Sequence, residues 1–233
     1  MDWLQNIDAN TFLFFNSLRS NFQDSFFFLF SGKFIWVPMY AAILFALLRS
    51  YNWKQVIVYV LGIALTITLA DQLGAHVLRP LFQRPRPSDA ASPIVGLVHL
   101  VGTYQAGGAY GFPSCHAANT FALATIVTLF FRRAALTYFL FLWAIVTCYS
   151  RIYLAAHYPG DLLAGAALGM VVGWCVFLLC LLGCRLIPSL NYQPFEKHVK
   201  VRVPGLVGIK YYPSNFIIIV GLITILYIAL ISL

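Results

Sequence analysis

The sequence predicts an all-α integral membrane protein with about five to six transmembrane helices and an N-terminal interfacial amphipathic helix. Hydrophobic residues make up 61% of the 233-residue chain, and its mean hydropathy is +0.82. Charged residues make up only 9%, against about 25% in soluble globular proteins. The few charged residues gather near the ends of apolar runs. These observations together indicate a membrane protein.

The transmembrane helices are predicted from apolar stretches, since about 20 apolar helical residues cross a bilayer core of about 30 Å. The stretches that approach this length are 34–48, 56–78, 117–131, 134–149, 162–183 and 216–233. The third and fourth are short, and we expect either that neighbouring polar residues snorkel to the interface or that the bilayer thins slightly around them. No internal repeat or soluble domain is evident, so we expect one transmembrane domain over 1–233. Its core would be 56–183, with 214–233 as an extra C-terminal helix.

The N-terminal residues 4–30 are rich in phenylalanine but interrupted by polar side chains. The interrupting residues are Asn16, Arg19, Asn21, Gln23 and Asp24. This pattern favours an interfacial amphipathic helix. A broken or re-entrant first span is the alternative.

The charged residues argue against several partners and predict an orientation. A formal net charge of +8 is shared among connections between apolar runs, whereas nucleic-acid binders cluster basic residues on a soluble face. Nine of the fifteen Lys and Arg fall in alternate connections: Arg49, Lys54, Arg132, Arg133, Arg185, Lys197, Lys200, Arg202 and Lys210. The positive-inside rule places these in the cytoplasm. We therefore expect a multi-pass protein of the bacterial inner membrane, with the basic segment 191–212 anchored to anionic lipid.

Three polar clusters lie at the opposite, outward ends of the predicted spans, facing the periplasm or cell exterior. The first contains Arg79 and Arg86-Pro87, the second Pro113-Ser114-Cys115-His116, and the third Ser150-Arg151, His157 and Asp161. The connection 79–116 is long and rich in Pro and Gly, which is typical of a functional loop. Arginine, histidine and aspartate are costly beside lipid, so these clusters indicate a functional site.

The residue types in these clusters favour phosphoryl transfer. Arg79, Arg86 and Arg151 can bind phosphate oxygens and stabilise transition-state charge. No carboxylate cluster or spaced histidine pair suggests a metal, the five cysteines show no metal-ligand or disulfide spacing, and no cofactor is expected. His157 is the predicted nucleophile, because Asp161 four residues later can orient its ring. His116 remains as the general acid.

These motifs resemble those of the type-2 phosphatidic acid phosphatase superfamily, which includes lipid phosphate phosphatases and the acid phosphatases and haloperoxidases, and most resemble its bacterial membrane branch. The resemblance implies a helical membrane fold and metal-independent hydrolysis through a phosphohistidine at His157, with acid catalysis by His116. It also implies phosphate binding by Arg79, Arg86, Ser114 and Arg151, with Cys115 beside them. Arg79 stands where the family usually has lysine, and Cys115 where it usually has glycine.

Other polar residues near the clusters receive supporting roles. Asp71 lies inside a predicted span, and we expect it to hold an arginine or serine near the site, with Ser150 also in a supporting position. Ser114 and Asp161 also fit helix N-caps. Arg84, taken alone, is interpreted as a headgroup anchor. A cysteine-phosphatase reading of Cys115 is disfavoured, because Phe121 occupies the position that would need arginine.

The expected activity is an outward-facing lipid phosphatase whose partners are the membrane and a lipid phosphate, with no nucleic acid and no obligate protein partner. Lipid A phosphate and undecaprenyl diphosphate rank nearly equal as substrates, followed by phosphatidylglycerol phosphate and phosphatidic acid. Two alternatives remain open: a non-catalytic lipid transporter or binding protein, and a lipid phosphotransferase.

Overall fold

The computed structural model describes residues 3–102, 104, 107–108, 110–190, 192–193, 196–197, 199–201 and 209–233. Its main helices are α1 (Trp3–Ser17), α2 (Asn21–Phe30), α3 (Val37–Ser50), α4 (Trp53–Gln72), α5 (Arg79–Phe82), α6 (Cys115–Phe131), α7 (Ala134–Tyr153), α8 (Pro159–Leu186) and α9 (Ser214–Ile231). Short helical turns η1 to η4 cover Phe34–Trp36, Leu73–Leu78, Val95–Leu97 and Pro188–Leu190. A small antiparallel hairpin joins β1 (Val199–Val201) to β2 (Ile209–Tyr211). The predicted all-α membrane class is confirmed.

Four helical segments of the described chain are long and apolar enough to cross a membrane: Trp53–Phe82, α7, α8 and α9. A fifth candidate is the pair Asn21–Phe30 and Phe34–Ser50, which is bent by 70°. The stretch predicted as a span at 34–48 is therefore the second arm of a bent pair. Residues 4–30 form two helices, because Ser20 caps a new helix by accepting the Gln23 backbone N–H.

The second span extends further than predicted. A π-helical turn, η2, joins α4 to α5, so the helix runs on to Phe82 and includes Arg79. Pro80 directly follows the π-helical turn, where the regular α-helical hydrogen-bond pattern is already interrupted. Gln83 ends the helix in a left-handed conformation. Arg79 consequently projects from a helix instead of from a loop.

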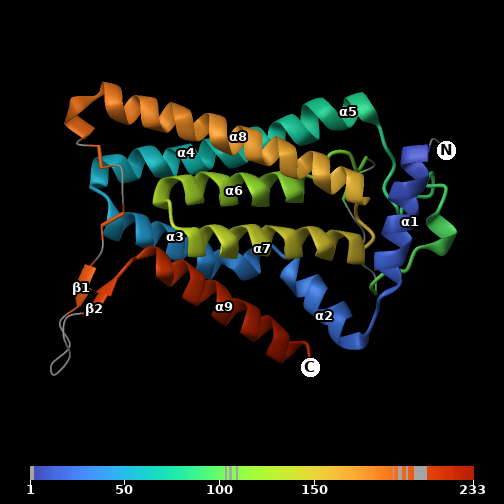
Figure 1. Ribbon diagram of the computed structural model, residues 1–233. Helices are drawn as coiled ribbons and strands as arrows, with labels where there is room; N and C mark the ends of the chain where they lie inside the picture. The colour runs from blue at the N-terminus through green and yellow to red at the C-terminus, as the bar shows by residue number, and fades with distance from the viewer. Residues whose placement is uncertain are drawn as a thin grey trace.

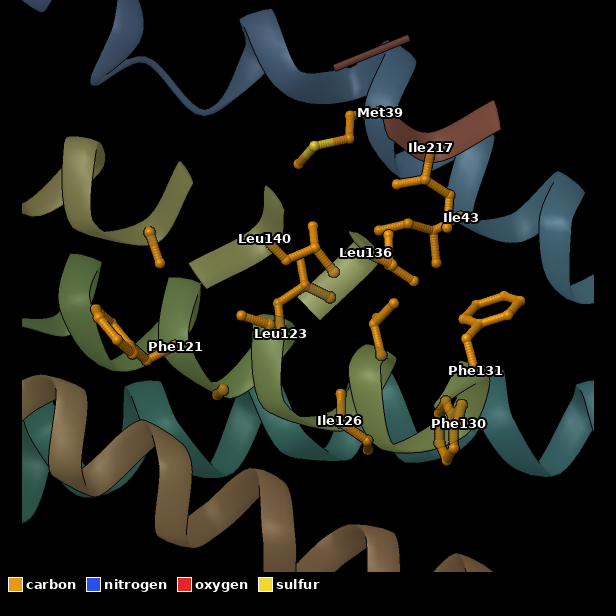
Figure 2. Close-up of a cluster of buried hydrophobic side chains, with 14 of the residues drawn as sticks. Met39, Ile43, Phe121, Leu123, Ile126, Phe130, Phe131, Leu136, Leu140 and Ile217 are labelled. Carbon is orange, nitrogen blue, oxygen red and sulfur yellow. The ribbon is translucent and has the colours of Figure 1, made fainter. Parts of the chain in front are cut away.

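Helix α6 lies in the middle of the bundle, with α4 and α8 on one side and α3 and α7 on the other (Figure 1). Twelve of its seventeen residues are buried. Figure 2 shows how its side chains, including Leu123, Ile126 and Phe130, lie in a core shared with Leu136 and Leu140 of α7 and Ile43 of α3. Because other helices surround α6, its ends contact protein and not lipid. The helix therefore does not need an apolar stretch as long as the bilayer core.

A seam of small residues brings α8 close to α6. Gly165, Gly169 and Gly173 recur at intervals of one helical turn and face Ser114, Ala118 and Ala122 of the partner segment. A Cβ at Gly165 or Gly169 would overlap the partner's backbone. This close approach is typical of small residues at membrane helix interfaces. The seam also aligns the two helix starts, where the Ser114 N–H donates to the Asp161 carbonyl at 2.9 Å.

Helix α1 lies across the end of the bundle where α5, α7 and the start of α8 meet (Figure 1). Phe12 is fully buried there and packs against the Tyr158 ring. The buried Asn16 amide donates to the Tyr153 carbonyl at 3.1 Å and to the His99 carbonyl at 3.2 Å. Helix α1 is thereby fastened to both α7 and the long loop.

Helix α8 begins three residues earlier than the predicted 162. Pro159 occupies its first turn, where a missing N–H costs nothing. Tyr158, not Asp161, is the N-cap residue, and the Asp161 carboxylate accepts the Tyr158 backbone N–H at 3.0 Å. The predicted N-cap role of Asp161 is thus corrected: the residue sits within the first turn, and its carboxylate accepts the backbone N–H of the N-cap residue.

Candidate active site

A cavity of about 400 Å³ lies beside the end of α2, with Phe30, Ser31 and Gly32 in its lining. Its lining includes these residues of the predicted site: Asp71, Arg79, Arg86, Cys115, His116, Arg151 and His157. They come from the end of the α4–α5 helix, the following loop, the first turn of α6, the last turn of α7 and the α7–α8 connection. The three sequence clusters therefore meet around one space.

His157 is buried between a carboxylate and a guanidinium. Its Nδ1 lies 3.6 Å from Asp161 Oδ2, and its Nε2 lies 3.1 Å from Arg86 Nη1. The guanidinium can only donate hydrogen bonds, so Nε2 accepts and Nδ1 carries the proton that faces Asp161. The tautomer with an unprotonated Nε2 is therefore the one that these neighbours select.

The surroundings keep His157 neutral. Burial first, and then the positive charges of Arg86, Arg151 and Arg79, lower the pKa of His157 well below its usual value. The imidazole is only 1% exposed. An unprotonated ring has the lone pair that a nucleophile requires.

Arg86 holds the long loop over the site. Its Nη2 donates to the Gly107 carbonyl at 2.8 Å, its Nε to the Gly108 carbonyl at 2.9 Å, and its Nη1 to the Ala156 carbonyl at 2.9 Å. Burial, with the nearby Arg79 and Arg151 charges, lowers the pKa of Arg86 to about 10, which leaves it charged at neutral pH. The loop glycines therefore supply carbonyls that fix this arginine.

Arg151 is fixed by two residues that the sequence analysis did not identify. Its Nη1 donates to Ser31 Oγ at 2.5 Å, and its Nη2 donates to the Tyr104 hydroxyl at 2.6 Å. Its Nε is buried and has no hydrogen-bond partner among the residues that the structure describes. Ser31 follows α2 and Tyr104 lies in the long loop, so no local sequence signal links either residue to Arg151.

The remaining cavity residues have fewer polar contacts. Arg79 Nε donates to the Pro113 carbonyl at 3.3 Å. Asp71 Oδ1 accepts from the Asn119 amide at 3.1 Å, so its partner is an asparagine and not the expected arginine or serine. The Cys115 thiol lies 3.9 Å from the Asp71 carbonyl, at the cavity wall. His116 lines the same wall.

Two serines of the predicted site do not line the cavity. Ser114 is fully buried and caps α6, where its Oγ accepts the Ala117 N–H at 3.4 Å. Ser150 is also fully buried and donates to the Thr147 carbonyl at 2.7 Å within its own helix. The N-cap interpretation of Ser114 is confirmed, whereas its hydroxyl is not among the groups that line the cavity.

The sequence predicts that Arg84 anchors a lipid headgroup, but in the structure it forms ion pairs with two carboxylates. Its Nη1 lies 2.8 Å from Asp161 Oδ1, and its Nη2 lies 2.6 Å from Asp8 Oδ2 on α1. The first predicted cluster thus contributes an additional cation, which contacts the carboxylate behind His157. Among the residues that the structure describes, no group of three or more His, Cys, Asp or Glu is placed to hold a metal ion.

An apolar groove of about 440 Å³ adjoins the cavity. It runs between α3, α4 and α6, with Ile43, Val60 and Leu123 in its wall. The groove and the cavity share Lys33, Tyr40, Asn119, Thr120 and Trp143. A ligand with a polar head in the cavity can therefore place an apolar chain among these helices.

Sequence comparison places this geometry in a known family. Residues 55–182, more than half of the chain, match the PAP2 superfamily. The chain belongs to the PAP2 superfamily. This assignment confirms the resemblance drawn from the three motifs.

Two curated relatives and one solved structure extend the PAP2 comparison. The chain is 49% identical over 179 residues to the lipid A 4′-phosphatase of Bacteroides thetaiotaomicron, covering 77% of this chain and 79% of that protein. It is 33% identical over 177 residues to the lipid A 4′-phosphatase of Porphyromonas gingivalis, covering 76% and 74%. The crystal structure of Aquifex aeolicus LpxE matches with a TM-score of 0.55 and 26% identity, covering 73% and 94%. PAP2 membership and these relatives support the predicted lipid phosphatase activity.

Proposed function

We propose that this protein removes the 4′-phosphate from lipid A. The observation that carries the proposal is the cavity in which Arg79, Arg86 and Arg151 surround the buried His157. Three cations around a neutral imidazole suit a phosphate ester, whose attack at phosphorus needs a nucleophile and charge stabilisation. The names of the two curated relatives favour the 4′-phosphate of lipid A over other lipid phosphates.

In the first step, His157 Nε2 attacks phosphorus while the arginines bind the phosphate oxygens. The new N–P bond forms as the ester P–O bond breaks, and His116 gives its proton to the leaving oxygen. Asp161 stabilises the charge on the His157 ring through Nδ1–H. Burial first, and then the positive charges of Arg151 and Arg86, lower the pKa of His116. The negative charge of bound phosphate offsets this and favours the protonated form that the first step needs.

In the second step, water attacks the phosphohistidine. His116, now neutral, takes a proton from this water, and the N–P bond breaks to release inorganic phosphate. The net reaction consumes one water and restores both histidines. No metal ion is needed in this scheme, because the arginines supply the positive charge.

The apolar groove gives the lipid portion of the substrate a place. Its wall of Ile43, Val60 and Leu123 is continuous with the cavity through shared residues such as Trp143. An acyl chain in this groove would keep the phosphate at the level of His157.

The proposed location is the bacterial inner membrane, with the site facing the periplasm. The α3–α4, α6–α7 and α8–β1 connections lie at the end of the bundle opposite the site (Figure 1). Arg132 and Arg133 lie in one of these connections, and Arg49, Lys54 and Arg185 lie in the adjoining helix ends. This distribution supports a cytoplasmic position for that end.

The proposal is tested by phosphate release from purified full-length protein in detergent with chelator present. The panel contains lipid A with 1- and 4′-phosphates, undecaprenyl diphosphate, phosphatidylglycerol phosphate and phosphatidic acid. We expect the highest kcat/KM on lipid A, with loss of the 4′-phosphate in the mass spectrum of the product. Preference for another lipid would contradict the assigned substrate, and activity that requires added Mg²⁺ would contradict the arginine-based site.

A second arm separates hydrolysis from transport and phosphotransfer. His157→Ala should abolish phosphate release, whereas a transporter would still move lipid between leaflets in this variant. Recovery of the phosphate on an alcohol acceptor, in place of inorganic phosphate, would instead favour a phosphotransferase.

A further inference from the structure

Arg84 connects the carboxylate behind the nucleophile to the N-terminal helix. One of its terminal nitrogens is 2.8 Å from Asp161 Oδ1, and the other is 2.6 Å from Asp8 Oδ2. The exposed fractions of the side chains are 14% for Asp8, 25% for Arg84 and 0% for Asp161. The three residues thus form a charged network that leads from α1 to a fully buried carboxylate.

Asp161 depends on this arginine for its charge and its direction. Its Oδ2 accepts the Tyr158 N–H and faces His157 Nδ1, whereas Oδ1 accepts from Arg84. A buried carboxylate without a positive partner is costly and tends to take up a proton. A protonated Asp161 would no longer stabilise positive charge on the attacking histidine. Arg84 therefore fixes one oxygen and leaves the other aimed at His157.

Arg84 is itself held from two sides. Its guanidinium carbon lies 4.2 Å from the centre of the Tyr158 ring, a cation–π distance. The Tyr158 hydroxyl pairs with Ser92 Oγ at 2.9 Å, which fixes the ring. Asp8 supplies the second contact and compensates the charge of the arginine.

Asp8 also contacts the first turn of α8 directly. Its Oδ1 accepts the Gly160 N–H at 2.7 Å, at a helix start that favours negative charge. A Cβ at position 160 would lie 2.8 Å from Asp8 Oδ2, so glycine allows this approach. The carboxylate thus joins α1 to the residue next to Asp161.

We propose that Asp8 and Arg84 are positioning residues of the phosphatase reaction. Arg84 keeps Asp161 ionised and aimed at His157, and Asp8 holds Arg84, so α1 becomes part of the active site. Neither residue lines the cavity, so neither touches the substrate. This inference rests on the proposed phosphatase function.

The test uses the full-length protein and the variants Arg84→Gln, Arg84→Lys, Asp8→Asn and the double variant Asp8→Asn with Arg84→Gln. We expect Arg84→Gln to lower kcat by about 10- to 100-fold, as is typical for supporting partners of a reactive group. KM should stay within about two-fold, because substrate contacts are retained. Asp8→Asn should lower kcat less, and Arg84→Lys should restore part of the loss. Asp8→Asn should add nothing to Arg84→Gln, because an asparagine oxygen can still accept the Gly160 N–H and the remaining effect of Asp8 acts through the arginine.

The pH dependence of kcat separates positioning from simple destabilisation. The charged and titratable groups that face Asp161 are Arg84, Arg86, His157 and Tyr158, with Asp8 behind Arg84. Loss of the Arg84 charge should let Asp161 take up a proton at higher pH. The acid limb of kcat should therefore move upward in Arg84→Gln and return in Arg84→Lys. A loss of rate that is equal at every pH would contradict the proposal.

Asp24→Asn is the matched control, because Asp24 also forms an ion pair with an arginine near the N-terminus, at 3.0 Å from Arg19. It should retain wild-type kcat and pH profile. The proposal is wrong if folded Arg84→Gln and Asp8→Asn keep wild-type kcat, or if their losses add in the double variant. If Arg84→Gln does not fold, the kcat values and pH profiles of Arg84→Lys and Asp8→Asn test the proposal instead. Failure of the phosphatase function itself would differ, because the wild type would then release no phosphate.

Discussion

At the scale of single residues, the sequence spacing predicts most of the cavity wall but not the residues that hold it. His157 and Asp161 lie four residues apart across the start of α8, so their proximity follows from the local geometry of the chain. Ser31, Tyr104 and Asp8 reach the site only because α2, the long loop and α1 pack there. Such contacts between distant segments leave no local pattern that a single sequence could reveal.

The lowered pKa of His157 predicts a measurable loss of stability in acid. Above about pH 6.5 the ring is neutral in both the folded and unfolded states, and below it only the unfolded state readily takes up the proton. Stability should therefore fall as pH falls below 6.5, by about 1.4 kcal/mol at pH 5.5 from this residue. Chemical unfolding in detergent at pH 7.5 and 5.5 should show this extra loss in the wild type relative to His157→Gln. Equal losses in the two proteins would contradict a neutral buried ring.

The Tyr104 hydroxyl should matter through Arg151. Tyr104→Phe removes an acceptor from a buried guanidinium, which costs about 1.5 kcal/mol or more for a charged group. We expect kcat/KM for the lipid substrate to fall about 10-fold. Tyr138→Phe is the control, because that tyrosine is 77% exposed on α7. An unchanged kcat/KM in Tyr104→Phe would show that Arg151 needs no help from the loop.

At the scale of elements, the helices follow from apolar length, but their ends follow from chemistry that hydropathy does not register. Pro159 begins α8 and η2 carries α4 past Arg79, so both helices exceed their apolar stretches. The small-residue seam between α6 and α8 is visible in the sequence as glycines four residues apart. The sequence does not show which helix packs against these glycines, because any apolar helix could provide the opposite face.

The seam predicts a large difference between two glycines of α8. Gly169→Ala would press a methyl group into the α6 backbone and should destabilise the protein by about 1–3 kcal/mol. The new Cβ of Gly183→Ala would meet no other described segment within 4 Å, so this change should be neutral or stabilising by up to about 1 kcal/mol. Thermal unfolding of both variants in the same detergent provides the comparison. Equal midpoints would mean that the seam can open without cost.

At the scale of the whole molecule, an anion site at one end of the bundle adjoins an apolar groove along its side. The sequence predicts the anion site through its three polar clusters. It does not predict the apolar groove, because every helix of a membrane protein has apolar faces. The groove exists only where α3 and α4 stand apart beside α6. The combination suits a substrate that is charged at one end and apolar over the rest of its length.

The groove predicts a selective effect on lipid substrates. Val60→Trp should fill it and lower kcat/KM for lipid A by about 10-fold, a loss of about 1.4 kcal/mol in binding the chains. Hydrolysis of a small soluble aryl phosphate should be unchanged, because the cavity stays open. Leu61→Trp, at a neighbouring position that is 64% exposed and outside the groove, is the control. Equal losses on both substrates would place the defect in the catalytic cavity instead.

The contact between Asp8 and Gly160 joins residues that are 152 positions apart. During synthesis, α1 leaves the ribosome long before its partner at the start of α8 exists. This contact, and those of Asp161 with Arg84 and His157, can therefore close only after the start of α8 has been made. A nascent chain that stops before Gly160 would carry the arginines of the first cluster into the membrane without the carboxylate that orients the nucleophile.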